Sequence, residues 1–133
     1  MIKNDTSGMK ILIIGTGAVG GLYGAKLSEG GAEVTLVCRS DYEVVKKNGI
    51  FVKSHLGDVH FQPKEVLRSA AEYKQEADFI LVATKVLPDI SIPDLIAPAL
   101  KKHTSIILLQ NGIHIEKPIA QAFPNHHLIS AIA

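Results

Sequence analysis

The stretch from Ile11 to Gly21, "ILIIGTGAVGG", decides how the rest of the chain folds. An apolar run leads into glycines spaced G-x-G-x-x-G, which predicts a buried strand that turns tightly into a helix. The start of a helix offers unpaired N–H groups and a partial positive charge, and both suit a diphosphate. A plain turn between strand and helix, without a ligand, is the alternative.

Each glycine of the motif has its own expected task. Gly15 would allow the tight turn, Gly17 would let a pyrophosphate approach the backbone, and Gly20 would let the helix pack closely on the strand. A second strand, rich in β-branched residues, begins at Glu33 after the expected helix. This strand-turn-helix-strand context is the one that a dinucleotide-binding motif requires.

Strand-like and helix-like segments alternate along most of the chain. Strands are expected over Lys10–Ile14, Glu33–Cys38, Phe79–Ala83, Ser105–Gln110 and His127–Ile132, and helices over Ala18–Glu29, within 40–49, and over Ser69–Gln75, Pro93–Lys102 and Ile115–Phe123. Such alternation predicts an α/β fold of the Rossmann type, a doubly wound and mainly parallel sheet with helices on both faces.

Two local patterns refine this outline. Residues 50–62, "IFVKSHLGDVHFQ", interrupt the alternation, and the runs on either side of Leu56-Gly57-Asp58 predict an antiparallel β-hairpin. Before it, Ser40 and Glu43 have the spacing of a capping box, and Gly49 is placed to end that helix. Pro98 should kink or shorten its helix, whereas Pro93 and Pro118 fit in first turns.

The end of the second strand, "VTLVCRSD", bears on the choice of nucleotide. NAD sites usually place an acid there for the ribose 2′-hydroxyl, and residues 36–38 contain none. Arg39 and Ser40 follow directly, and a guanidinium with a hydroxyl suits the 2′-phosphate of NADP. Asp41 comes too late and fits better in the first turn of the helix. NADP is therefore favoured over NAD, with a solvated loop charge as the alternative role for Arg39.

Two further polar residues follow strands of the predicted sheet. Lys85 comes after "FILVAT" and Asn111 after "SIILLQ", and ligands of parallel sheets bind beyond these carboxyl ends. An ammonium at 85 could bind a cofactor phosphate, a ribose or an anionic substrate. The Asn111 amide could hold a ribose, the nicotinamide or a substrate carbonyl. Asn-Gly is also a common turn signal, so a turn without a binding role stays open.

Composition excludes several other classes of protein. The 133 residues are 47% hydrophobic and carry a formal net charge of +1, so no global field points to nucleic acid or a membrane surface. The apolar runs are too short to span a bilayer. Six histidines show no metal-ligand spacing, so no metal is expected. A single cysteine, Cys38, fits a reducing cytoplasm, and Arg39 beside it would lower its pKa. Residues 1–8 are expected to form a disordered extension.

The segments "GTGAVGG", "CR", "ATK" and "LQNGI", in this order and spacing, resemble the ketopantoate reductase (2-dehydropantoate 2-reductase) family. The resemblance covers residues 9–133 and implies the N-terminal, NADP-binding Rossmann domain of such an enzyme. These enzymes reduce ketopantoate to pantoate with NADPH, on the route to pantothenate and coenzyme A. The hairpin at 50–62 matches an insertion of the family.

The resemblance also implies roles for individual residues. The diphosphate would lie on residues 15–20, the 2′-phosphate on Arg39, and the nicotinamide and substrate would meet near Asn111. The full set implied for cofactor binding is Gly15, Thr16, Gly17, Ala18, Val19, Gly20, Arg39, Ser40, Lys85 and Asn111. His114 replaces a residue that is small or polar in many relatives. Its side chain could lie near the nicotinamide or on the surface, and both alternatives stay open.

No catalytic residue is expected within these 133 residues. In the family, the lysine that protonates the forming alkoxide and a carboxylate that grips the substrate belong to a second, helical domain. The chain ends on a strand without that domain, so alone it is expected to be inactive. A homodimer of the full-length protein is compatible with the resemblance.

Two other functions compete with this interpretation. One is the NADP domain of a related 2-oxo acid reductase, or of a hydroxyacid or sugar-acid dehydrogenase. The other is a stand-alone module that senses NAD(P) without turnover. A reading frame that continues into a mainly helical segment would favour an enzyme, and one that stops at Ala133 would favour a sensor.

Overall fold

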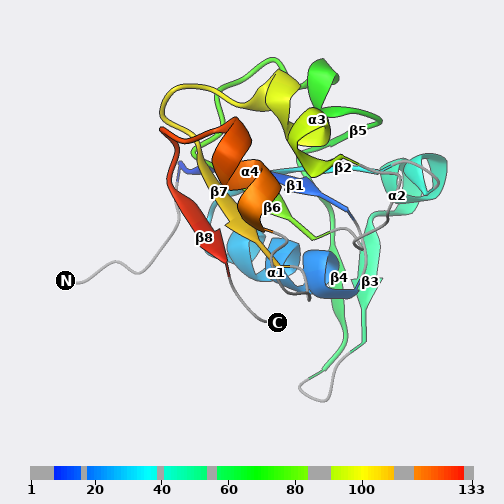
Figure 1. The fold of residues 1–133 in the computed structure, drawn as a ribbon. Helices are drawn as coiled ribbons and strands as arrows, with labels where there is room; N and C mark the ends of the chain where they lie inside the picture. The colour runs from blue at the N-terminus through cyan, green and yellow to red at the C-terminus, as the bar shows by residue number, and fades with distance from the viewer. Residues whose placement is uncertain are drawn as a thin grey trace.

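The computed structural model describes residues 8–15, 18–38, 41–53, 57–83, 91–109 and 116–130. A six-stranded parallel sheet forms its centre, in the order β5-β2-β1-β6-β7-β8 (Figure 1). The strands are β1 (Lys10–Ile14), β2 (Glu33–Val37), β5 (Glu65–Leu67), β6 (Phe79–Val82), β7 (Ser105–Leu108) and β8 (Leu128–Ser130). The doubly wound Rossmann-type fold expected from the sequence is thereby confirmed.

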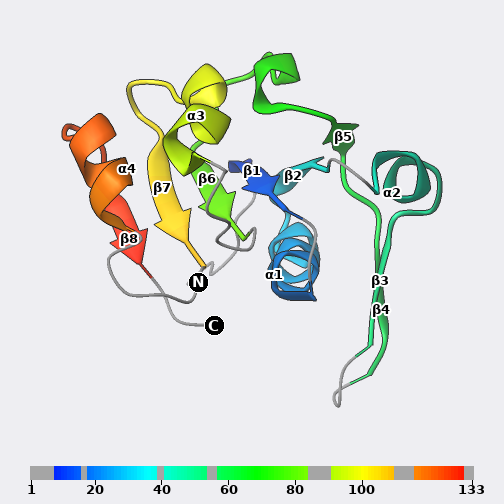
Figure 2. The ribbon, with the colours of Figure 1, turned by 45° about the vertical axis from the view of Figure 1, so that its right-hand side comes forward.

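Helices cover both faces of the sheet (Figure 2). The described helices are α1 (Ala18–Glu29), α2 (Tyr42–Asn48), α3 (Ile92–Ile96) and α4 (Glu116–Ala122), with short 3₁₀ turns η1 (Ala70–Glu72) and η2 (Ala97–Ala99). Residues of β1 alternate between two apolar clusters. Leu12 and Ile14 pack with residues of α3 and α4, whereas Ile11 and Ile13 pack with residues of α1 and α2. The central strand is therefore buried on both sides, which explains its continuous apolar sequence.

The predicted hairpin is present, and it extends away from the sheet (Figure 2). Its strands are β3 (Ile50–Val52) and β4 (Val59–Phe61), paired antiparallel. Phe61 is buried against α1, at a position where Gly24 leaves room for the ring. A Cβ at Gly24 would lie only 2.7 Å from Cε2 of Phe61. Phe51 points the other way, is 68% exposed and stacks on His60.

One strand of the sheet was not predicted. β5 has only three residues, Glu65–Leu67, with too short a pattern to be recognised. It forms because it pairs in parallel with β2, with Leu67 opposite Val37, and because Val66 and Leu67 are buried. Tertiary pairing, not local sequence, makes this segment a strand.

Helix ends also differ from the predictions. α2 begins at Tyr42 with Asp41 as its N-cap, so the capping box of Ser40 and Glu43 is wrong. The capping box lies instead at Ser69 and Glu72, where it starts the 3₁₀ turn η1 in place of a longer helix.

Prolines and chain ends account for the other differences. The helix expected over Pro93–Lys102 ends at Ile96, and η2 follows with Pro98 in it, which is the shortening that Pro98 predicts. Pro118 lies in the first turn of α4, as expected. The expected strand ends at 110 and 131–132, and residues 1–7 of the expected extension, lie outside the described residues.

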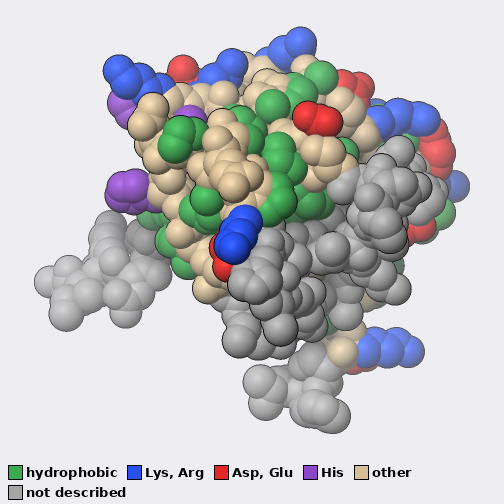
Figure 3. Space-filling view, viewed as in Figure 1, with side chains coloured by type: hydrophobic (Ala, Val, Ile, Leu, Met, Phe, Trp, Pro, Cys, Tyr) green, Lys and Arg blue, Asp and Glu red, His purple; other side chains and the backbone are tan. Residues whose placement is uncertain are grey.

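Among the described side chains that Figure 3 shows, Lys and Arg do not form a continuous basic face. Hydrophobic side chains gather over α3 and α4, and side chains of both charges lie around them. Within the described residues, no helix is long and apolar enough to cross a membrane.

Candidate cofactor-binding site

Four strands of the sheet end in line at one edge. Ile14, the last residue of β1, is in register with Val37 of β2 and with Val82 of β6, and Val82 is in register with Leu108 of β7. From β1 the chain passes to β2 on one side, and it later returns to β6 on the other. Ligands of such sheets bind beyond the carboxyl ends at this reversal of strand order.

Backbone hydrogen bonds extend this alignment by one residue. The N–H of Gly15 donates to the carbonyl of Val37 over 3.1 Å, and the N–H of Ala83 donates to the carbonyl of Ile14 over 2.9 Å. Leu109 donates in the same way to Val82 over 2.8 Å. The chain therefore leaves the sheet at Gly15, Ala83 and Leu109 along one edge.

The turn from β1 into α1 requires glycine at two places. Gly15 has a φ of 104°, in the left-handed region that favours glycine. A Cβ at Gly20 would lie 2.8 Å from the carbonyl oxygen of Gly15 and 3.2 Å from Cβ of Ala83. The first turns of α1 thus lie against the ends of both β1 and β6, at the reversal of strand order.

The end of β2 is apolar and buried. Cys38 is 2% exposed, and its N–H donates to the carbonyl of Leu67 over 2.9 Å. Burial, aided by the charge of Asp41, raises the pKa of the Cys38 thiol to about 11. The expectation of a lowered pKa is therefore wrong. Asp41, the first acid after this strand, is exposed and makes no side-chain capping hydrogen bond to α2.

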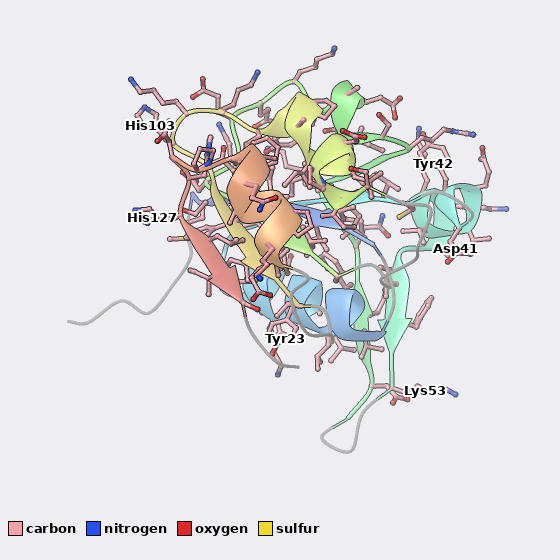
Figure 4. The ribbon with its side chains drawn as sticks, in the orientation of Figure 1. Tyr23, Asp41, Tyr42, Lys53, His103 and His127 are labelled. Carbon is pink, nitrogen blue, oxygen red and sulfur yellow. The ribbon has the colours of Figure 1, made fainter. Side chains whose placement is uncertain are left out.

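A charged cluster next to this strand end was missed from the sequence. The guanidinium of Arg68 lies over the ring of Tyr42, 4.2 Å from its centroid, and donates to Oε1 of Glu43 over 2.7 Å. Lys46 donates to the Tyr42 hydroxyl over 2.8 Å, and this hydrogen bond raises the pKa of Lys46. Figure 4 shows Tyr42 beside Asp41 at the start of α2. Arg68 follows β5, so only recognition of that strand would have placed it here.

The structure places only part of the expected binding set. Gly15 and Gly20 meet at the turn, and the backbone of Ala18 and Val19 belongs to the first turn of α1. The other expected residues lie outside the described residues: Thr16, Gly17, Arg39, Ser40, Lys85, Asn111 and His114. Their segments directly follow β1, β2, β6 and β7, which all end at the same edge.

Histidines of the described part of the chain do not gather at this edge. His103 and His127 precede β7 and β8, at the opposite ends of those strands (Figure 4). Among the residues described, no three His, Cys, Asp or Glu side chains are grouped so that they could hold a metal ion.

Comparison with known proteins decides the family. The model of the family described as "Ketopantoate reductase PanE/ApbA" matches residues 11–133. The chain belongs to the ketopantoate reductase family. Ketopantoate reductases are oxidoreductases, and the match corresponds to the N-terminal part of its relatives. The resemblance seen in the sequence motifs is thereby confirmed.

Named relatives agree with this assignment. A 2-dehydropantoate 2-reductase of Nostoc sp. is 36% identical over 92% of this chain and 38% of its own length. The crystal structure of 2-dehydropantoate 2-reductase from Methylococcus capsulatus is 46% identical, with a TM-score of 0.85 over 92% of this chain and 40% of that one. The chain thus spans about two fifths of the length of these ketopantoate reductases.

A second similar structure contains a nicotinamide cofactor. It is the ternary structure of D-mandelate dehydrogenase with NADH and anilino(oxo)acetate, 28% identical with a TM-score of 0.79. It covers 93% of this chain and 40% of its own. The same fold therefore accommodates NADH in that protein.

Proposed function

We propose that residues 9–133 form the NADP(H)-binding domain of an NADPH-dependent 2-dehydropantoate 2-reductase, which reduces ketopantoate to pantoate. The observation that supports it best is the tight glycine turn at the reversal of strand order, where Gly20 lies against both Gly15 and Ala83. Dinucleotides bind at this point of a doubly wound sheet. We also propose a cytoplasmic enzyme, with a homodimer as the form to test first.

The described part of the site fits a dinucleotide. Gly15 is in a left-handed conformation, and a side chain at Gly20 would collide with the backbone, so the turn is compact. The helix that follows has 12 residues, long enough to carry a macrodipole, and it begins at the edge where β1 and β6 end. A diphosphate on the N–H groups of residues 15–20 would complete this arrangement.

The remaining residues of the site would bind and orient. Arg39 and Ser40 would hold the 2′-phosphate, Lys85 would contact the cofactor, and the Asn111 amide would orient the nicotinamide and the 2-oxo group. A bound nicotinamide supplies the hydride that reduces the carbonyl. The general acid belongs to the part of the relatives' length that this chain does not span, so no residue here is assigned that role.

The preference for NADP rests on the end of β2. Cys38 is buried, and residues 36–38 offer no carboxylate to a ribose 2′-hydroxyl. Without that acceptor, a ribose 2′-hydroxyl finds no partner on the strand itself. A 2′-phosphate, by contrast, would meet the guanidinium at 39.

Calorimetric titration of the protein with NADPH and NADH tests this proposal. We expect NADPH to bind more tightly, and Arg39→Asp to reduce its affinity about tenfold or more, because the substitution replaces a charge-assisted hydrogen bond by repulsion. Lys53→Asp makes the same charge change on the exposed hairpin, where Lys53 points away from the sheet (Figure 4). A preference for NADPH that survives Arg39→Asp would remove the argument for the 2′-phosphate.

The substrate requires a separate measurement. In a protein that spans the full length of the relatives, NADPH oxidation should depend on ketopantoate, and Asn111→Ala should lower kcat/KM. The similarity to D-mandelate dehydrogenase favours a second candidate, a reductase of another 2-oxo acid. Faster turnover of an aryl-substituted 2-oxo acid than of ketopantoate would select it. Binding of NADPH without turnover of either acid would instead indicate a sensing module.

A further inference from the structure

Arg68 follows β5, the strand that lies beside β2 at the outer edge of the sheet. Leu67 is in register with Val37, and the N–H of Cys38 donates to the carbonyl of Leu67. The backbone of Arg68 therefore leaves β5 beside Cys38, the residue that follows β2. Two arginines follow neighbouring strands at the same edge of the sheet.

The side chain of Arg68 is directed toward the segment that follows Arg39. Its guanidinium stacks on Tyr42 and pairs with Glu43, and both residues belong to the first turn of α2. This turn begins two residues after Ser40. The structure thus brings the guanidinium of Arg68 to the first turn of α2.

Tyr42 holds this guanidinium without using its hydrogen-bonding capacity. Stacking covers a flat face of the group, whereas its five N–H donors point outward in the plane. One of them, on Nη2, reaches Glu43. No other side-chain donor of Arg68 has a partner among the residues that the structure describes. A guanidinium oriented in this way is well suited to a phosphate.

The ion pair with Glu43 is easily exchanged. The side chain of Arg68 is 60% exposed and that of Glu43 is 79% exposed, and exposed pairs of this kind contribute little. Glu72, another acid near β5, already accepts hydrogen bonds from the backbone N–H groups of Arg68 and Ser69, not from the guanidinium. Lys46, bound to the Tyr42 hydroxyl, adds a second cation.

We propose that Arg68, stacked on Tyr42, is a second phosphate-binding residue that determines the preference for a 2′-phosphorylated adenosine. The proposal rests on the proposed function, because it deepens the NADP(H) site. Arg39 would bind the phosphate from the end of β2, and Arg68 would bind it from the end of β5. Glu43 holds the guanidinium in place while no phosphate is bound.

Binding of 2′,5′-ADP and of 5′-AMP tests the role of Arg68, because the two probes differ only in the 2′-phosphate. In Arg68→Ala, we expect the affinity for 2′,5′-ADP to fall about tenfold, as for loss of a charge-assisted hydrogen bond, and that for 5′-AMP to stay unchanged. Arg68→Lys should recover only part of the loss, because an ammonium lacks the planar fork.

Lys47→Ala is the matched control, because it removes one exposed cation from the last turn of α2. Lys47 makes no described contact with Tyr42. It should leave both affinities unchanged, and thermal unfolding should confirm that all variants fold. An unchanged ratio of the two affinities in Arg68→Ala, together with a lost preference in Arg39→Asp, would overturn this inference and leave the proposed function intact. A parent protein that binds neither probe would contradict both.

Discussion

At the scale of single residues, Gly20 gives the sharpest stability prediction. Alanine is a better helix former than glycine by about 1 kcal/mol, so Gly20→Ala would stabilise an isolated helix. Here the added Cβ would lie 2.8 Å from the Gly15 carbonyl oxygen, backbone that cannot easily move. We expect a net loss of about 1–3 kcal/mol from this overpacking, measured by urea unfolding.

The same substitution should also weaken NADPH binding, because the turn that would hold the diphosphate must open to relieve the contact. Glycine at 20 would not be required for packing if the alanine variant were as stable as the parent protein.

Cys38 predicts a specific dependence of stability on pH. Its thiol has a pKa of about 11 in the folded protein against 9.0 as the reference for an unfolded chain. Between these values the unfolded state loses the proton and the native state keeps it, so stability falls as pH rises from about 9 to 11. The loss should approach about 3 kcal/mol. Below pH 9 this effect is absent.

Cys38→Ala supplies the comparison for that measurement. Other groups titrate in the same range, so the difference between the parent and variant unfolding curves is the informative quantity. The difference in the free energy of unfolding between parent and variant should shrink between pH 9 and 11. If this free energy fell equally with pH in both proteins, a thiol that stays buried and protonated would be contradicted.

At the scale of elements, the hairpin should depend on one of its two phenylalanines. Phe61 is 3% exposed and packs on α1, whereas Phe51 is 68% exposed on the other side of the hairpin. Phe61→Ala should lower the free energy of unfolding by about 3–5 kcal/mol. Phe51→Ala, the matched control, should cost less than about 1 kcal/mol, because it loses only its stacking on His60. Similar costs would mean that the hairpin does not pack as described.

The start of β7 depends on a buried hydroxyl. Thr104 is 2% exposed, donates to the carbonyl of Ala77 over 2.7 Å and accepts the N–H of Lys101 over 3.2 Å. Thr104→Val keeps the shape but leaves both backbone groups without this partner, so we expect a loss of about 1–3 kcal/mol in thermal unfolding. Thr104→Ser should restore most of it, and a stable valine variant would show that the hydroxyl is dispensable.

The elements also show what the sequence could and could not predict. β1 and α1 were predicted with their observed ends, because a buried apolar run and a glycine turn are strong local signals. β5 was missed because its three residues become a strand only by pairing with β2. The N-cap of α2 was misplaced by one residue: the helix begins after Asp41, and Glu43, which the capping box required, pairs with Arg68, which follows β5.

The candidate site, like the fold, could be predicted only where its signals are local in the sequence. The glycine turn was recognised because its residues are adjacent in sequence. The contact of Arg68 with Tyr42 joins residues 26 positions apart through a strand that was not recognised. The binding roles of all the expected residues stay predictions. Thr16, Gly17, Arg39, Ser40, Lys85 and Asn111 lie outside the described part of the chain.

At the scale of the whole molecule, we predict that the 133 residues alone do not reduce ketopantoate. The chain spans about two fifths of the length of its relatives, and none of its residues is assigned as the general acid. The assay is NADPH oxidation at 340 nm, a wavelength at which only the reduced cofactor absorbs, with the longer protein as control. Steady turnover by the short chain would contradict the assignment of proton donation to the remaining polypeptide.

The central position of β1 has a consequence for how the protein is made. β1 pairs with β2, which follows soon after it in the chain, and also with β6, which follows much later. Asp78, the residue before β6, binds the backbone of Lys10 twice: its N–H donates to the Lys10 carbonyl, and its carboxylate accepts from the Lys10 N–H. During synthesis, one side of β1 can be paired early, while its other side stays open until β6 has left the ribosome. Until then one edge of an apolar strand stays unpaired, and unpaired strand edges are the sites at which chains aggregate.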